Sequence, residues 1–281
     1  MKFWRWLVLT LLVVLPCTIT IDDDPCTDCG PGLMGLAQVV VDPFTLFPGP
    51  GGPVAGDAAQ DFDGTDDYFS ATGWYPGSSE DGIASFWIRR DATGVTHVIH
   101  ANGNTTYWFG INSANKVGFL LRNSSLVTLL EMNSGATTIT DTNWHHVLAS
   151  WELDSTPRSW FYLDDVDVKT ATTEAQGFVA WPHTTNHIGG NGLVTPGDLL
   201  DGCLSEFYVQ VGEFLDLSVT ANRRLFIDAS AKPVELGSDG STPTGVQPEV
   251  YIPGDDFTDN KGTNANLVAS GGPVACSNNP G

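Results

Sequence analysis

Basic residues are scarce in this sequence of 281 residues. Only 12 lysines and arginines stand against 33 aspartates and glutamates, which gives a formal net charge of -21. No basic run is longer than the pairs Arg89-Arg90 and Arg223-Arg224. Binding nucleic acid through its phosphates needs clustered Lys and Arg, so we expect no nucleic-acid partner. An acidic surface suits either a soluble exposed protein or one that holds calcium.

A long hydrophobic run is also absent. Lys2 and Arg5 precede the apolar segment Leu7–Leu15, which is too short for an ordinary membrane span and has the proportions of a signal peptide. We therefore predict that residues 1–20 are a cleaved leader, and that the mature protein is secreted or at the cell surface with no membrane span. Lipidation at Cys17 and retention of the leader are the alternatives.

Cysteines are few, and their number is informative if the chain is exported. Loss of the leader removes Cys17 and leaves Cys26, Cys29, Cys203 and Cys276. An oxidising compartment favours disulfides among these four, although the sequence does not choose between the three connectivities. The Cys-x-x-Cys pair with two distant cysteines is also compatible with a zinc site. We predict disulfides.

Short apolar runs separated by turn residues dominate the chain after residue 57. Residues 21–56 are rich in Pro and Gly and read as a linker, whereas residues 57–228 contain about ten apolar segments at roughly 8–12-residue spacing. Alternation is clear in several of them: Phe86 and Ile88 share one face, and Trp87 takes the other. This pattern predicts an all-β fold, an antiparallel sandwich or barrel.

One helix and a C-terminal extension complete the predicted architecture. Apolar residues recur at helical spacing within Leu215–Ile227. Residues 229–281 are turn-rich and too poor in apolar residues to form a core of their own. We expect this extension to pack on or beside the sandwich, with strands at Glu249–Ile252 and Asn266–Ala269.

The order of several segments resembles laminin-G-like domains, which are concanavalin A-like lectin/glucanase sandwiches of jelly-roll type. The resemblance covers roughly residues 57–228, and the extension resembles one found on laminin-G-like proteins encoded by phages and prophages. It is carried by FDGTDDYFSA (62–71), IASFWIRR (83–90), NWHHVLASWELD (143–154), RSWFYLDDVDV (158–168), HIGG (187–190) and LDGCLSEFYVQ (200–210).

The resemblance implies a structural calcium ion near the first strand. Its oxygen ligands would come from the Phe-Asp-Gly segment and from an Asp-Glu pair in the last strand, so Asp63, Asp66 and Glu206 are the candidate ligands. Here the Asp of that late pair is Ser205, which lowers the charge around the ion. The resemblance also places Trp144 in the core, with one of the two following histidines pointing inward and the other outward.

No catalytic residue is predicted. Some members of the superfamily are glycoside hydrolases with a row of three carboxylates on one strand. Glu152 and Asp154 share a strand face, but Ser, Thr and Pro follow where the third carboxylate would stand. Serine-hydrolase and zinc-hydrolase motifs are missing as well, and His183 and His187 lie on a predicted loop, which is a poor geometry for a metal pair.

Aromatic residues near predicted loops are the candidate ligand-binding groups. Trp74, Tyr75, Trp108 and Trp181 could stack on the apolar C–H faces of sugar rings. The predicted function is a non-catalytic module that recognises a glycan, a cell-surface partner or a virion protein. The alternative is a virion or appendage subunit that assembles with its own copies as a homo-oligomer; glycoside hydrolysis, which rests on fold analogy, is the third possibility.

Overall fold

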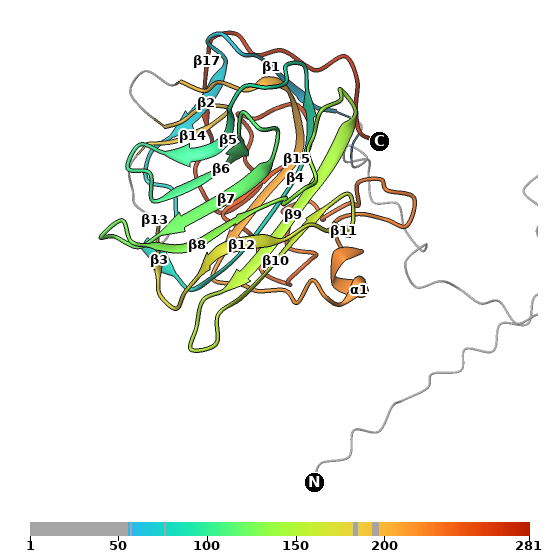
Figure 1. Cartoon of the computed structure of the whole chain (residues 1–281). Helices are drawn as coiled ribbons and strands as arrows, with labels where there is room; N and C mark the ends of the chain where they lie inside the picture. Colours follow the sequence, from blue (N-terminus) through green and yellow to red (C-terminus); the bar gives the residue numbers. More distant parts are fainter. Residues whose placement is uncertain (1–55, 57, 76, 182–184, 193–196) are drawn as a thin grey trace, which may run out of the picture. The chain divides into compact units, whose positions relative to one another are not determined.

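The computed structural model describes residues 56, 58–75, 77–181, 185–192 and 197–281 (Figure 1). Within them, antiparallel strands form two large sheets. The first sheet has the spatial order β1 (Gln60–Asp63), β15 (Asp201–Val211), β4 (Asp81–Arg90), β9 (Trp144–Glu152), β10 (Arg158–Leu163) and β11 (Val166–Asp167), and β16 (Val250–Ile252) also pairs with β15.

The second sheet has its own set of strands. Their order is β12 (Thr170–Glu174), β8 (Thr128–Asn133), β7 (Val117–Arg122), β6 (Tyr107–Ile111), β5 (His97–Asn102), β14 (Asn186–Ile188), β2 (Tyr68–Ala71) and β17 (Val268–Ser270). A small separate sheet pairs β13 (Val179–Trp181) with β3 (Gly77–Ser79). The predicted all-β, two-sheet sandwich is confirmed.

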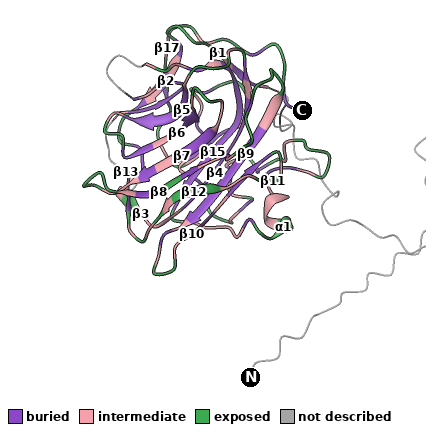
Figure 2. Cartoon of the chain, viewed as in Figure 1, coloured by how far each residue is buried: buried purple, intermediate pink, exposed green. Residues whose placement is uncertain are grey.

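The core lies between the two large sheets and is rich in aromatic rings. Phe86 on β4 of the first sheet is 6.5 Å from Phe119 on β7 of the second, measured between ring centroids. Phe86 and Ile88 are both fully buried on the predicted inward face. Figure 2 shows the burial of the central strands of both sheets. The period-two pattern therefore identified the core-facing side of this strand correctly.

The outer face of the first sheet is covered as well. Leu217, Phe226 and Leu236 pack there against Ile83 and Tyr208. The covering segment is not the long helix that the sequence predicts for Leu215–Ile227, because the structure has only the single turn α1 (Thr220–Arg223). The predicted helix is therefore wrong in length. The apolar residues instead belong to an irregular segment, and each of them packs separately on the sheet.

The C-terminal extension belongs to the sandwich itself. Strand β16 adds to the first sheet beside β15, and β17 forms the edge of the second sheet beside β2. Both lie where the sequence predicts strands, although β17 extends one residue past the predicted end at Ala269. The described residues between 56 and 281 belong to one compact unit. The extension thus packs on the sandwich as expected, by completing both sheets.

The structure corrects the expectation for Trp144. Its side chain is half-buried and packs against Ala59, Cys203 and Cys276 on the outer side of the first sheet. Trp151, seven residues further along the same strand, is the fully buried one. An odd spacing on a strand reverses the side, so the two indoles face opposite ways. No helix among the described residues has the length and apolarity needed to cross a membrane.

Candidate functional site

Three of the four predicted sugar-stacking aromatics are buried in the core. Trp74 and Trp181 are 0% exposed and Tyr75 is 2% exposed. The Tyr75 ring centroid is 4.9 Å from that of Trp181, and the Tyr75 hydroxyl is 2.7 Å from His100 Nε2. The Trp74 Nε1–H donates to the carbonyl of Ala265 at 3.0 Å. These rings contact one another, and none presents a face to a ligand, so their assignment to a surface site is wrong.

Trp108 is the exception, because it lies on the opposite face of the second sheet. Its indole covers Gly110 on the same strand and Gly118 on β7, two glycines that pair across the strands. A Cβ atom on Gly110 would lie only 2.4 Å from the indole ring. The two glycines therefore let the ring lie close against the sheet with its outer face half-exposed.

Strand register places Trp108 in a row of aligned side chains that crosses the second sheet. Strand pairing aligns its members from β8 to β17 on the face that points away from the core: Glu131, Leu120, Trp108, Ala101, His187, Ser70 and Val268. Glu131 and Val268 are exposed, and Leu120 and Ser70 are half-buried. We call these seven residues the outer row.

His187 is the buried aromatic member of the outer row. Its ring centroid is 4.9 Å from that of Tyr68, and the side chain is 4% exposed. Burial lowers the pKa of His187 to about 4, so the imidazole is neutral at ordinary pH. His183, which the sequence predicts to be a poor metal-binding partner for His187, lies outside the described residues. The contacts of His187 indicate a packing role.

Of the predicted calcium ligands, the structure brings together Asp63 and Asp66 with Asp67 of the same loop. Their ligand atoms lie within 4.8 Å of one another. Two of these carboxylates are already occupied: Asp63 Oδ1 accepts from the Thr65 N–H at 2.8 Å, which is the main reason that its pKa is lowered, and Asp67 Oδ1 accepts from the Gly272 N–H at 2.8 Å.

Glu206 does not join this cluster. In the pairing of β1 with β15, Asp63 lies opposite Asp201, which is five residues from Glu206, or roughly 16 Å along a strand. Glu206 is 4% exposed and accepts from the Gly56 N–H at 2.9 Å. Burial raises its pKa to about 7. A ligand set shared by Asp63 and Glu206 is therefore wrong.

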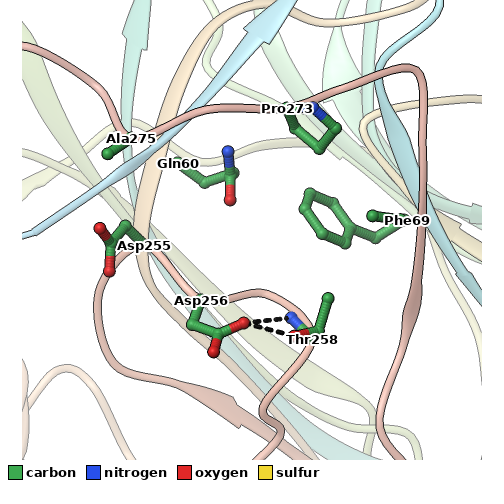
Figure 3. Close-up of a pocket in the computed structure, with 8 residues that line it drawn as sticks. Gln60, Phe69, Asp255, Asp256, Thr258, Pro273 and Ala275 are labelled. Carbon is green, nitrogen blue, oxygen red and sulfur yellow. Dashed lines mark hydrogen bonds between the residues drawn. The ribbon is translucent and has the colours of Figure 1, made fainter.

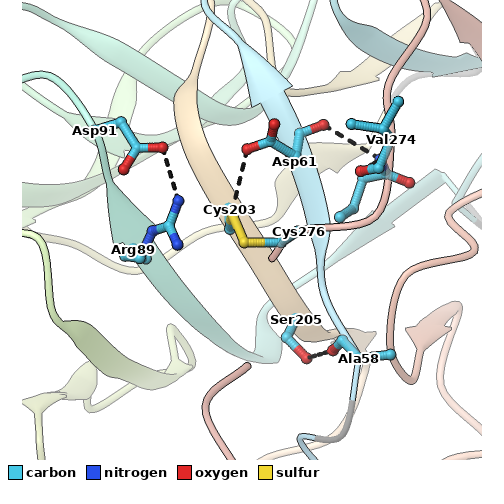
Figure 4. The surroundings of a disulfide bond; sticks show 9 residues. Ala58, Asp61, Arg89, Asp91, Cys203, Ser205, Val274 and Cys276 are labelled. Carbon is cyan, nitrogen blue, oxygen red and sulfur yellow. Dashed lines mark hydrogen bonds and ion pairs between the residues drawn. A yellow bond between two sulfur atoms is a disulfide. The ribbon is translucent and has the colours of Figure 1, made fainter. Parts of the chain in front are cut away.

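Cys203 and Cys276 form a disulfide, with their Cα atoms 6.2 Å apart (Figure 4). The bond ties the end of the extension to β15. Next to it, the Cys276 N–H donates to the Ala59 carbonyl at 2.7 Å, and the Asp61 N–H donates to the Val274 carbonyl at 2.8 Å. This part of the disulfide prediction is confirmed. Cys26 and Cys29 lie outside the described residues.

Glu152 and Asp154 have structural partners. Glu152 forms an ion pair with Arg158 across the β9–β10 hairpin, at 2.5 Å. Asp154 Oδ1 accepts from the Thr156 N–H at 2.8 Å and so stabilises the turn. The two histidines that follow Trp144 are neighbours on β9 and so take opposite faces of the first sheet, as predicted. His146 is on the outer face with Trp144, where it is 1% exposed and packs beside Trp87.

Comparison with known proteins defines the class of the molecule. Residues 63–213 match the laminin G family model described as the concanavalin A-like lectin/glucanases superfamily. The match covers more than half of the chain, and the chain belongs to this family. No curated protein matches the sequence.

Two solved structures share the fold at low sequence identity. One is described as a candidate carbohydrate binding protein from Bacteroides ovatus, with a TM-score of 0.56 and 12% identity over 82% of this chain and 62% of that one. The other is a heptameric SAP-like pentraxin from Limulus polyphemus, with a TM-score of 0.50 and 14% identity over 78% of this chain and 94% of that one. The chain thus spans less than two thirds of the Bacteroides protein.

Proposed function

We propose that this protein is a non-catalytic recognition module that binds a glycan on the outer row, with Trp108 as the stacking platform. The observation that carries the proposal is the Trp108 indole, which lies against Gly110 and Gly118 with one face half-exposed. An aromatic face held in this way matches the apolar C–H face of a sugar ring. The likeness to a structure described as carbohydrate-binding supports this function.

Two further features favour the outer row over the other faces. The outer face of the first sheet is covered by the chain around Leu217 and Phe226. On the second sheet, Glu131 lies two strands from Trp108, which is about 10 Å at normal strand spacing. Its exposed carboxylate can accept hydrogen bonds from sugar hydroxyls beyond the stacked ring. This spacing suits a ligand with more than one sugar unit.

A glycan array followed by calorimetry on the best ligand tests the proposal. We expect Trp108→Ala to weaken binding by about tenfold or more, because a stacked aromatic is a typical hot spot. Trp160→Ala is the matched control, since Trp160 is a half-buried indole on the first sheet, and it should bind like the wild type. An array without any ligand, or full affinity in Trp108→Ala, would exclude the proposed site.

Secretion is part of the proposal. The Cys203–Cys276 disulfide supports it, because such bonds persist in oxidising compartments. Intact-mass measurement of the native protein tests it: loss of roughly the first twenty residues is the expected result for a cleaved leader.

Calcium remains a proposal for the Asp63, Asp66 and Asp67 loop alone. Carboxylate oxygens are the ligands that calcium prefers, and three are close together here. After treatment with a chelator, calorimetric titration with calcium chloride should give heat that Asp66→Asn removes and Glu206→Gln preserves. Absence of heat in the wild type would end this proposal.

Self-assembly into a virion or appendage structure is the alternative function. It is favoured by two exposed apolar side chains near the C-terminal edge, Val268 at 66% and Val274 at 60% exposure, and by the likeness to a heptameric pentraxin. Light scattering separates the two functions. A large assembly that Val268→Asp with Val274→Asp dissociates would support the structural role, and a monomer would support the recognition module.

A further inference from the structure

A short segment near the C-terminus lies along the edge of the first sheet. We call this segment, residues 273–276, the strap. The Asp61 N–H on β1 donates to the Val274 carbonyl at 2.8 Å, and the Cys276 N–H donates to the Ala59 carbonyl at 2.7 Å. Strand β15 pairs with the other side of β1. The strap therefore occupies the edge of β1 that would otherwise be open to a further strand.

Side chains contribute little to the attachment of the strap. Val274 is 60% exposed and Ala275 is exposed as well, and of the four residues only Cys276 is buried. A pocket of about 430 Å³ lies beside the strap, with Pro273 and Ala275 on one side and the loop after β16 on the other (Figure 3). One side of the strap therefore borders open space, and backbone hydrogen bonds are its main noncovalent attachment.

The Cys203–Cys276 disulfide fixes the strap in this position (Figure 4). Cys203 lies opposite Asp61 in the pairing of β15 with β1, so the bond crosses β1 on the outer face of the first sheet. Gly271 and Gly272 join the strap to β17. The φ angle of Gly271 is +82°, and a Cβ atom on Gly272 would meet no atom within 4 Å. Cleavage of the disulfide thus leaves a weakly attached segment on a hinge of two glycines.

Asp61 provides a hydrogen-bond acceptor for the reduced form of Cys203. Its Oδ1 is 3.3 Å from Cys203 Sγ, and no N–H or O–H group of the described chain donates to this carboxylate. A disulfide sulfur has no proton, whereas the thiol of reduced Cys203 can donate to Asp61. The negative charge also disfavours the Cys203 thiolate that reoxidation requires. Asp61 therefore stabilises the reduced state.

Reduction by a small thiol, such as glutathione, takes two exchange steps. The thiolate of the first thiol attacks Cys276 Sγ, since Cys276 is 9% exposed and Cys203 is 0% exposed, and Cys203 leaves as a thiolate that takes up a proton. A second thiolate then attacks the small-thiol sulfur of the mixed disulfide and releases Cys276, which also takes up a proton. The two small thiols are oxidised to their disulfide, and their two electrons reduce the two cysteines.

We propose that the strap is a redox latch on a strand-docking edge. Reduction of Cys203 and Cys276 releases the strap from β1 while the sandwich stays folded, and the open edge then accepts the strap of a second copy. The residues beyond the strap are released with it, because the Gly281 N–H bond to the Gly56 carbonyl, at 3.0 Å, is a single backbone contact.

A second copy is the partner that fits this edge. Its strap makes with β1 the same hydrogen bonds that the chain makes with itself, so exchange between copies costs no contact. Reoxidation then joins Cys203 of one copy to Cys276 of the other. The proposal is independent of glycan binding at Trp108, because the latch and the outer row share no residue.

Covalent dimers on gels without reductant test the exchange. The full-length chain with Cys17, Cys26 and Cys29 replaced by serine keeps only Cys203 and Cys276. After reduction with dithiothreitol without denaturant and reoxidation with glutathione disulfide, we expect a dimer whose fraction rises with protein concentration. When isotope-labelled and unlabelled chains are mixed, peptide mass spectrometry should find the Cys203–Cys276 bond between the two kinds of chain. Monomers at every concentration, or dimers joined through like cysteines, would overturn the docking of a second copy.

Hydrogen exchange measures the release of the strap itself. In the reduced chain at low concentration, the Asp61 and Cys276 amides should exchange about tenfold faster or more, because their hydrogen bonds open. The amides of β4, which pairs on both sides, should keep their protection. Equal protection of the Asp61 amide in both redox states would overturn the latch, and so would loss of protection in β4, since that is unfolding of the whole sandwich.

Asp61→Ala tests whether this site favours the reduced state, which a merely structural disulfide would not require. At equilibrium with glutathione, the ratio of reduced to oxidised protein should fall about fivefold in Asp61→Ala, because the acceptor of the Cys203 thiol is lost. Asp201→Ala is the matched control, since Asp201 shares a face of β15 with Cys203, and it should keep the wild-type ratio. An equal fall in both variants, or in neither, would overturn the role of Asp61.

Discussion

The buried histidine His146 should make the stability of this protein fall in weak acid. Its side chain is 1% exposed, its Nε2 is 2.9 Å from the Ser85 hydroxyl, and its ring centroid is 4.9 Å from that of Trp87. The Nδ1 atom has no hydrogen-bond partner within the described chain. Burial lowers the pKa of His146 to about 4.

The sign of the effect follows from the two pKa values. In the unfolded chain His146 has a pKa near 6.5, so between pH 6.5 and 4 the unfolded state takes up a proton that the folded state does not. The neutral His146 therefore contributes fully to the free energy of unfolding above pH 6.5, and this contribution is lost as pH falls toward 4. Between pH 8 and pH 5 the loss is about 2 kcal/mol for this one side chain.

Urea unfolding followed by tryptophan fluorescence at pH 8 and pH 5 measures this loss. The wild-type difference also contains the other buried histidines, so the informative quantity is the change between variants. In His146→Gln, the loss of unfolding free energy from pH 8 to pH 5 should be about 2 kcal/mol smaller than in the wild type. Gln retains a polar group for Ser85.

His145→Gln is the matched control with the opposite sign. Burial lowers the pKa of His145, but hydrogen bonds to Asp164 at 2.7 Å and Asp141 at 2.9 Å outweigh it, and the net pKa is raised. Protonated His145 stabilises the folded state at low pH, and this stabilisation is lost as pH rises. His145→Gln should therefore enlarge the loss of unfolding free energy from pH 8 to pH 5. If His146→Gln loses as much unfolding free energy between pH 8 and pH 5 as the wild type does, the reasoning is refuted.

Three further perturbations have defined outcomes. Replacing Cys203 and Cys276 with Ser should lower the unfolding free energy by about 4 kcal/mol in urea titration, because the bond closes a loop with a sequence separation of 73; an unchanged midpoint would contradict this. Glu206→Gln should abolish a stability loss of about 2 to 3 kcal/mol between pH 5 and pH 8, since the folded pKa near 7 is raised and stability falls as pH rises through it; the same loss in both proteins would show that Glu206 ionises freely. Gly202→Ala should lower the melting temperature, because its Cβ would lie 2.1 Å from the Arg89 carbonyl and its φ is +145°; an unaltered melting curve would mean that this strand contact relaxes without cost.

The local pattern of the sequence was sufficient for the strands and for their inward side. Phe86 and Ile88 face the core as the alternation predicts, because successive side chains of a strand point to opposite faces regardless of what packs on them. The two strands of the extension were also visible, since each is a short apolar segment between turn residues. The segment that includes Leu217 and Phe226 was misread, because apolar residues that contact a sheet one at a time can imitate helical spacing.

The candidate site depended on facts that local pattern does not contain. Trp74, Tyr75 and Trp181 lie near loops in the sequence, as Trp108 does, but packing between the sheets buries the first three and leaves the fourth on an outer face. A glycine two residues after Trp108 was the only local signal for the platform; its partner Gly118 is brought beside it by strand register.

The sequence by itself determined the all-β class, the two-faced strands and the acidic character of the chain. Tertiary structure decided which sheet face stays open, that Asp63 lies opposite Asp201 and far from Glu206, and that Gln60 and Asp256 line one pocket. The physical reason is that alternation assigns a side chain to one of two faces, whereas register and the covering segments decide what each face meets.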